Sequence, residues 1–225
     1  MAKKEDATPK ELENVEIALS KSEQFIEKYQ KQLLIGVAVV VAIVLAILAF
    51  RNFYLKPRVE QAEKEIYKAQ NYFAVDSFKV ALEGNGSVDM MGFKEIASEY
   101  GSTPSGKLAK AYAGICYYKL GDYQNAVKYL NDYSGKDEFF KTSVIGLTGD
   151  AYAELGDADK AFDYYKKAAG MKNDLAPVYL KKAGILYETK GKPEEALKMY
   201  KNIKDNYPAS LQAADIDKYI ARIEK

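Results

Sequence analysis

The longest hydrophobic stretch in the chain runs from Leu33 to Phe50 and reads LLIGVAVVVAIVLAILAF, with no charged side chain inside it. As a helix it is roughly 27 Å long, close to the thickness of the hydrocarbon core of a bilayer. Lipid offers no partner for unpaired backbone groups, so a segment that crosses it must be helical. Arg51 ends the stretch, and Phe53 and Tyr54 are of the kind found at the lipid–water interface. The pattern predicts one transmembrane helix within residues 33–55, in contact with membrane lipid.

A cleaved signal peptide and a buried core helix are the two alternatives for this stretch. A signal peptide has a short basic leader, an apolar run of about 7–15 residues and a small-residue cleavage site. Here the leader is long and mixed in charge, and Arg51 and Asn52 directly after Phe50 form a poor cleavage context. We therefore expect the helix to remain as a membrane anchor, with residues 1–32 forming an N-terminal tail.

The tail has a hydrophobic pattern of its own. Thr8 and Pro9 form a typical helix start, in which the hydroxyl caps the helix and the proline takes its first position. Apolar residues then recur every three to four positions, with Ser22 as the one gap, at Leu12, Val15, Leu19, Ile26, Tyr29 and Leu33. This spacing predicts an amphipathic helix, which packs against a partner at the membrane face or lies on the lipid surface. The pattern favours neither alternative.

From Gly106 onward, the pattern of small and bulky residues repeats. Gly121, Gly156 and Gly191 are each 35 residues apart. Small residues recur seven positions before and five after each of these glycines, and bulky residues recur four before and nine after. A small residue lets two helices approach closely, and glycine suits a left-handed helix end, so each unit is predicted to be a helical hairpin. The recurring positions are Gly114, Gly149 and Gly184; Ala126, Ala161 and Ala196; Tyr117, Tyr152 and Tyr187; and Leu130, Tyr165 and Tyr200.

This pattern resembles the tetratricopeptide repeat, which has a period of about 34 residues and two antiparallel helices per unit. The resemblance implies an all-α fold in which a right-handed α-solenoid follows the N-terminal transmembrane helix. It predicts a long helix and a degenerate first repeat in residues 56–106, three repeats in 107–210, and a C-terminal capping helix in 211–225. In the degenerate unit, Arg58–Leu82 is the expected first helix and Met90–Tyr100 the expected second.

The composition argues against an enzyme. With 33 basic and 32 acidic side chains and no basic cluster, the chain is not suited to a nucleic-acid partner. It has no histidine, which is the commonest general base and metal ligand, and its one cysteine, Cys116, is expected to be a structural thiol. Residues 101–107 nearly match a phosphate-binding loop, but Leu108 stands where a magnesium-binding hydroxyl is needed. We expect no catalytic residue, cofactor or metal.

The resemblance also implies where partners bind. The concave face of a tetratricopeptide array is lined mainly by the first helices of its repeats. Some relatives clamp a peptide carboxylate there with several basic side chains, but only Lys181 is basic here, so extended and partly apolar segments are favoured. For each residue, packing against a neighbouring repeat is an alternative to contact with a partner and is given equal weight. The implied groove positions are Leu108, Ala111, Ile115 and Tyr118; Ser143, Gly146, Asp150 and Ala153; and Val178, Lys181, Ile185 and Glu188.

The order of segments is similar to that of the YfgM-like ancillary subunit of the Sec translocon, and the stretch Phe93–Gly106 before the first full repeat has the look of that family. In that family the repeats face the periplasm and work with the translocon and a membrane-anchored prolyl-isomerase-type chaperone. The resemblance implies a single-pass protein of the bacterial inner membrane with a cytoplasmic N-terminus and periplasmic repeats. Its expected role is a non-enzymatic scaffold or chaperone-like subunit that binds Sec subunits, this chaperone or exported polypeptides.

Two other functions remain open. A cytoplasm-facing receptor for precursor proteins, or a general assembly scaffold, would suit the charge distribution, because basic residues are more numerous after the hydrophobic stretch than before it. A membrane-tethered enzyme is the second, but the sequence lacks a coherent catalytic set. The flanking basic residues are Lys21, Lys28 and Lys31 before the stretch and Arg51, Lys56, Arg58, Lys64 and Lys68 after it.

Overall fold

The computed structural model describes residues 9–87 and 89–224, with side chains from Phe25 onward except at position 27. Within these ranges the chain is helical and contains no β-strand, so the predicted all-α class is confirmed for the described residues. The chain forms two compact units, one ending at Lys56 and the other beginning at Pro57.

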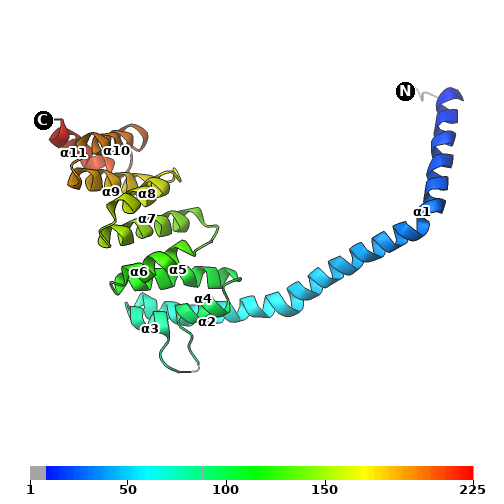
Figure 1. Cartoon of the computed structure of the whole chain (residues 1–225), viewed down its shortest axis with the longest axis horizontal. Helices are drawn as coiled ribbons and strands as arrows, with labels where there is room; N and C mark the ends of the chain where they lie inside the picture. The colour runs from blue at the N-terminus through cyan, green and yellow to red at the C-terminus, as the bar shows by residue number, and fades with distance from the viewer. Residues whose placement is uncertain (1–8, 88, 225) are drawn as a thin grey trace, which may run out of the picture. The chain divides into compact units, whose positions relative to one another are not determined.

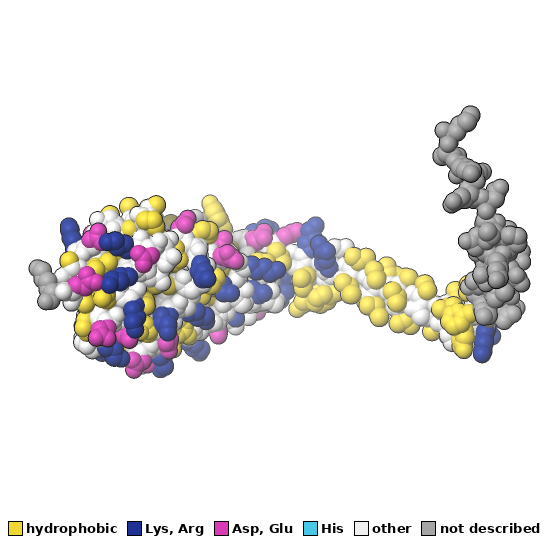
Figure 2. All heavy atoms as spheres, turned by 90° about the horizontal axis from the view of Figure 1, so that it is seen from above, with side chains coloured by type: hydrophobic (Ala, Val, Ile, Leu, Met, Phe, Trp, Pro, Cys, Tyr) yellow, Lys and Arg dark blue, Asp and Glu magenta, His cyan; other side chains and the backbone are white. Residues whose placement is uncertain are grey.

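The N-terminal unit consists of the long helix α1, Pro9–Ala49, and a short π-helix, η1, Phe50–Leu55. Its apolar stretch is long enough to cross a membrane by length and composition, and none of it is buried. Figure 2 shows hydrophobic side chains covering this part of the helix. The predicted cap Thr8 lies outside the described residues, as do the side chains of the predicted apolar positions before Phe25.

The π-helix η1 lies directly before Pro57. Proline has no backbone N–H, and its ring would collide with the carbonyl group four residues earlier in a regular helix. In η1 the backbone hydrogen bonds reach the fifth residue instead, as when the Lys56 N–H donates to the Arg51 carbonyl. The wider turn places the irregularity before the proline, and the helix then continues as α2, Lys56–Ala74.

The prediction of one helix over Arg58–Leu82 is wrong, because α2 stops and a separate helix, α3, follows at Phe78–Glu83. Asp76 takes a left-handed φ of 58° between them. The turn brings Phe78 back against Phe73, with ring centroids 5.4 Å apart in an edge-to-face arrangement. Sequence periodicity could not indicate this break, because it depends on an aromatic contact that forms only in the folded chain.

The second helix of the degenerate unit, α4, spans Phe93–Glu99 and is shorter than the predicted Met90–Tyr100. It begins late because the preceding residue, Gly92, is extended and lies against backbone: a Cβ atom there would be 2.4 Å from the Gly84 nitrogen. Phe93 is fully buried in a core that α2, α3, α4 and α5 share. This unit is therefore built from the long helix α2 and the two short helices α3 and α4 instead of a simple hairpin.

Three helical hairpins follow in the order predicted, and Figure 1 shows them stacked one after another along the chain. Within each pair the helices contact each other, and the second helix also contacts the first helix of the next pair, which is the packing of an α-solenoid. The pairs are α5 (Pro104–Lys119) with α6 (Tyr123–Asn131), α7 (Glu138–Glu154) with α8 (Ala158–Ala169), and α9 (Ala176–Thr189) with α10 (Pro193–Asn206).

The turns inside the three hairpins share one backbone geometry. Each contains a glycine with a left-handed φ, of 80° at Gly121, 78° at Gly156 and 69° at Gly191. The amide after each glycine donates to the carbonyl of the recurring tyrosine, which closes the first helix. These amide–carbonyl pairs are Asp122–Tyr117, Asp157–Tyr152 and Lys192–Tyr187, each at 2.9 Å. The 35-residue glycine period thus reflects a backbone requirement at the hairpin turn.

The helices of each hairpin approach closely at the second recurring glycine. A Cβ atom on that glycine would overlap the bulky side chain of the partner helix, so the bulky residue occupies the space that the glycine leaves free. The distances to the nearest side-chain atom would be 2.6 Å for Gly114 and Leu130, 2.8 Å for Gly149 and Tyr165, and 2.3 Å for Gly184 and Tyr200. The recurring glycine of the first helix and the recurring bulky residue of the second helix therefore form a single contact between the two helices.

The solenoid ends in a short 3-10 turn, η2, Ala213–Asp215, and the helix α11, Ile216–Ile223. Ile216 and Ile220 are buried in the core cluster that contains Tyr200. The other side of α11 is polar and exposed. The helix thus covers apolar side chains at the end of the third repeat.

Gly184→Ala should destabilise the protein by about 1–3 kcal/mol, because the added methyl group overlaps the buried Tyr200 ring. Urea unfolding of the full-length protein, followed by circular dichroism, measures the change. Lys198→Ala is the matched control on α10: it removes only an exposed ion pair with Glu195 and should change stability by less than about 0.5 kcal/mol. Equal stability of Gly184→Ala and the parent would contradict the close contact.

Candidate protein-binding surface

Side chains link each of the first helices α5, α7 and α9 to the next one along the solenoid. Tyr118 in α5 is close to Asp150 in α7: burial chiefly raises the pKa of its phenol, and the negative charge of Asp150 raises it further. Asp150 in turn binds Lys182 of α9 through an ion pair of 2.7 Å. The predicted groove side chains of these helices that are not fully buried are called the first-helix surface; they are Leu108, Ile115, Tyr118, Ser143, Asp150, Ala153, Val178, Lys181, Ile185 and Glu188.

Most predicted groove residues are accessible on this surface. Ile185 is the most exposed of the apolar ones, at 41%. Five others, Leu108, Ile115, Tyr118, Ala153 and Val178, are partly exposed. These side chains offer apolar area that a bound polypeptide could cover.

Two predicted groove residues are placed inside the solenoid instead. Ala111 is fully buried in the cluster that contains Leu130 and Val144. Gly146 is covered by the Tyr179 ring of the next repeat, since a Cβ atom there would lie 1.8 Å from the ring. Both predictions of a partner contact are therefore wrong for these side chains. Packing between repeats was the alternative that the sequence left open for each position, and here it applies.

Asp150 is the centre of a hydrogen-bonded network. Its carboxylate accepts the Tyr165 hydroxyl at 2.8 Å and the Lys182 ammonium at 2.7 and 2.8 Å. Burial raises the pKa of Tyr165, and the adjacent Asp150 carboxylate raises it further, so this phenol stays protonated and acts as a donor. The network fixes α7 to its own second helix and to α9. Asp150 therefore acts on this surface as a structural ion-pair partner.

Glu188 has the same kind of network one repeat later. Its carboxylate accepts the Tyr200 hydroxyl at 2.5 Å and the Arg222 guanidinium at 2.7 and 3.1 Å. Lys181 is held as well, with its ammonium 2.7 Å and 2.8 Å from the two oxygens of Asp215. The one basic residue predicted for the groove is thus neutralised by Asp215, in the segment before α11.

Sequence reasoning missed the partners of these charges. Lys182, Asp215 and Arg222 were not predicted to reach the first-helix surface, although Asp215 and Arg222 lie 34 residues after Lys181 and Glu188. That spacing is one residue less than the 35-residue repeat period, so opposite charges about one period apart were an available indication. It would have shown that α11 takes the place of a further first helix.

Two other features noted in the sequence have structural roles. Thr103 caps α5 by accepting the Gly106 amide at 3.0 Å, and the segment before it is the helix α4, not the strand that a phosphate-binding loop requires. Cys116 is fully buried, and burial raises the pKa of its thiol to about 12. A thiol with this pKa is not an activated nucleophile.

Open cavities of about 510 and 500 Å³ lie where α5 and α9 begin. Leu108 lines the first beside Pro104 and Tyr133. Val178 lines the second beside Tyr207 and Pro208. The corresponding place at α7 contains a hydrogen bond of 2.8 Å from the Asn173 amide to Thr142. The predicted residues Leu108 and Val178 therefore lie at an edge of the solenoid, near the start of the first helices.

Sequence models of the tetratricopeptide repeat match residues 110–136, 145–175 and 178–210, one for each hairpin. This chain carries tetratricopeptide repeats. No curated protein sequence matches the chain. Such repeats are protein-binding scaffolds, and nothing in the described residues, which include no cluster of metal-ligating side chains, points to catalysis.

Solved structures agree on the fold. Two crystal structures from Podosopora anserina, described as a kinesin light chain with nearly identical TPR-like repeats, superpose on this tetratricopeptide solenoid with a TM-score of 0.54 and 13% sequence identity. Each superposition covers 72% of this chain and 84% or 85% of the solved chain. At this identity the likeness establishes the fold alone.

Glu188→Gln should lower the urea midpoint of unfolding at neutral pH, because the Arg222 pair is lost. Partial burial raises the pKa of Glu188, but hydrogen bonds from Arg222 and Tyr200 outweigh it and hold the pKa below its ordinary value of 4.5. A carboxyl group with a lowered folded-state pKa stabilises the protein above its unfolded pKa and loses this contribution as the pH falls. The difference between variant and parent should therefore shrink as the pH falls below about 4.5. A difference independent of pH would contradict the ion pair.

Proposed function

We propose that this protein is a non-enzymatic, membrane-anchored tetratricopeptide scaffold that works beside the Sec protein-export channel. Its repeats face the periplasm of a bacterium, and its first-helix surface binds Sec subunits, a membrane-anchored prolyl-isomerase-type chaperone or exported polypeptides. The observation that carries this proposal is the combination, in one chain, of an unburied apolar helix of membrane-spanning length with a repeat solenoid.

The exposed apolar helix supports the anchor. A core helix of a soluble protein buries its apolar side chains, whereas Leu34, Val40 and Leu45 are 59–69% exposed here. An exposed apolar surface of this size in water would favour aggregation, and lipid removes that cost. Phe50, Phe53 and Arg51 then lie where the helix meets the headgroups.

The first-helix surface supports binding as the mechanism. Its accessible side chains are mostly apolar or aromatic, and its three predicted charged residues are already paired within the protein. A polypeptide that covers Ile115, Tyr118 and Ile185 gains apolar burial without breaking those pairs. The anchor keeps this surface near the membrane, so a partner in the same membrane meets it at high effective concentration even where each contact is weak.

A cytoplasm-facing receptor for precursor proteins is the second candidate. The greater number of basic residues after the hydrophobic stretch, beginning with Arg51 and Lys56, favours it under the positive-inside rule. Large domains translocate largely regardless of such charges, so the rule has less weight here. Protease treatment of sealed vesicles of known orientation distinguishes the two, since the periplasmic repeats are cut only from the periplasmic side.

The anchor predicts that the full-length protein stays in the membrane pellet after extraction with alkaline carbonate. A Val40→Arg and Val44→Arg double variant should be released, because each charge at the centre of the helix costs about 2.5–3.5 kcal/mol in the membrane. The matched control is the Val40→Leu and Val44→Leu variant, which should remain in the pellet. Carbonate release of the parent protein would refute the anchor.

Photocrosslinking in native membranes tests the partner. A photoreactive amino acid at position 118 or 185 should give adducts with Sec subunits, the chaperone or exported chains, because Tyr118 and Ile185 face the accessible side of the first helices. The control position is Lys166, an exposed residue on the second helix α8. Adducts from Lys166 alone would place the binding surface elsewhere, and recovery of none of these partners from any position would defeat the proposed function.

A further inference from the structure

The loop between α3 and α4 contains a short sequence motif that takes no part in the repeats. Asn85, Gly86 and Ser87 form the pattern Asn-x-Ser, in which x is not proline. This pattern marks an asparagine to which an oligosaccharide is attached, provided that it lies in a surface loop of an exported protein. Asn85 is the only asparagine of the sequence with serine or threonine two positions later. Because the motif is short, its structural context decides what it does.

The tripeptide lies in the exposed part of this loop. Asn85, Gly86 and Ser87 are all exposed, and Figure 1 shows the loop projecting away from the helices. A Cβ atom on Gly86 would meet no heavy atom of the surrounding described residues within 4 Å, so the space there is open. An enzyme that modifies Asn85 must enclose the asparagine and serine side chains together, and the open space gives it room to do so.

The two ends of the loop are fixed, in contrast to the exposed tripeptide between them. Leu82 and Met90, one on each side of it, are only 1% and 7% exposed. A Cβ atom on Gly84 would be 2.9 Å from the Met90 carbonyl oxygen, so the two sides of the loop approach closely at its base. An oligosaccharide on Asn85 would therefore extend into solvent while the core below the loop stays packed.

The Asn85 side chain is held by a local hydrogen bond. Its Oδ1 atom accepts the Ser87 amide at 3.0 Å, which is the geometry of an Asx turn. Among the described residues, the Asn85 Nδ2 atom and the Ser87 hydroxyl group have no hydrogen-bond partner. The nitrogen that would carry a sugar and the hydroxyl that completes the motif are thus both available to an enzyme.

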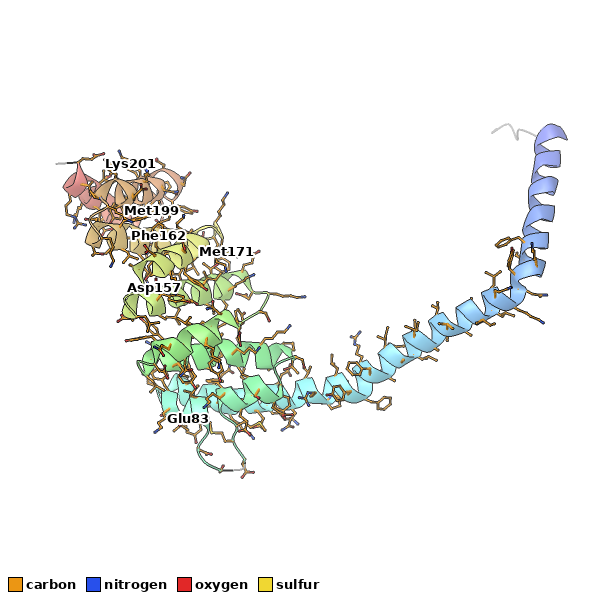
Figure 3. The ribbon with its side chains drawn as sticks, in the orientation of Figure 1. Glu83, Asp157, Phe162, Met171, Met199 and Lys201 are labelled. Atoms are coloured by element: carbon orange, nitrogen blue, oxygen red, sulfur yellow. The ribbon has the colours of Figure 1, made fainter. Side chains whose placement is uncertain are left out.

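An acidic residue lies two positions before the asparagine. Figure 3 labels this residue, Glu83, which is the last residue of α3, where the loop leaves the helix. Its side chain is exposed. A basic group of an enzyme that binds the loop can pair with this carboxylate, which adds a charged contact beside the tripeptide.

We propose that Asn85 is an acceptor for an N-linked oligosaccharide, transferred from a polyprenyl pyrophosphate carrier by a membrane-bound transferase that acts outside the cytoplasm. The Asn85 Nδ2 atom forms a bond to the anomeric carbon of the oligosaccharide, and the bond from that carbon to the pyrophosphate oxygen breaks. The pyrophosphate oxygen keeps the electron pair, and the amide nitrogen gives up one proton. The proposal rests on the proposed function, because it requires repeats that face the periplasm.

Production of the full-length protein in two bacterial hosts tests this. One host carries a periplasmic oligosaccharyltransferase and its lipid-linked oligosaccharide, and the other lacks only the transferase. Intact-mass spectrometry measures the fraction of molecules that carry the oligosaccharide, and fragmentation of the loop peptide locates it. The parent should carry one oligosaccharide, on Asn85, only in the first host. Asn85→Gln and Ser87→Ala should each lower the modified fraction at least about tenfold, because each removes a required group.

Three further variants separate recognition of the motif from loss of fold. Ser87→Thr should stay within about twofold of the parent, because threonine also supplies the hydroxyl group. Glu83→Gln should lower the modified fraction by roughly twofold to fivefold, the loss expected for one exposed ion pair. The control is Asn71→Gln, which changes an exposed asparagine of α2 outside the motif and should leave the fraction unchanged. All of these positions are exposed, so every variant should unfold at the temperature of the parent.

A parent protein without oligosaccharide, in vesicles where protease cuts the repeats from the periplasmic side, would overturn the acceptor and leave the proposed function intact. An oligosaccharide that persists in Asn85→Gln would also overturn the acceptor, because its attachment would then be elsewhere. A parent without oligosaccharide whose repeats are protected from protease on the periplasmic side would refute both the acceptor and the periplasmic orientation.

Discussion

The close approach of two helices at one glycine is the contact on which the solenoid depends. In each hairpin a bulky side chain of the second helix fills the space left by the missing Cβ atom of the first, as Tyr200 does at Gly184. A larger residue would separate the helices, expose the core and alter the angle at which the next hairpin stacks. Because each repeat packs only on its neighbours, this local geometry is transmitted along the whole array.

The same packing determines which charges remain available to a partner. Stacking places Asp150 beside Lys182 and Glu188 beside Arg222, so the C-terminal part of the first-helix surface is internally neutralised. Partly buried pairs of this kind bring little net stability but fix how neighbouring helices meet. The accessible side chains that remain on this surface are therefore chiefly apolar or aromatic, as at Ile115 and Ile185.

The apolar face at each end of the solenoid is covered in a different way. At the C-terminus, α11 adds a helix whose buried side contains Ile216 and Ile220 and whose other side is polar. At the N-terminal end, three segments, α2, α3 and α4, share one core with α5. The break at Asp76 permits this, since it lets Phe78 pack on Phe73. A degenerate repeat is therefore a consequence of closing the core at that end.

The sequence by itself determined the helical class, the three hairpins and the apolar stretch, because glycine spacing and hydrophobic runs are local properties of the chain. It also indicated Ile185 and Tyr118 as accessible residues. Only the tertiary structure decided that Ala111 is buried, that Lys181 is already paired, and that the long helix breaks near Asp76. Each of these features depends on a residue of another helix that folding brings near. The spacing of residues along the chain does not give the distances between helices.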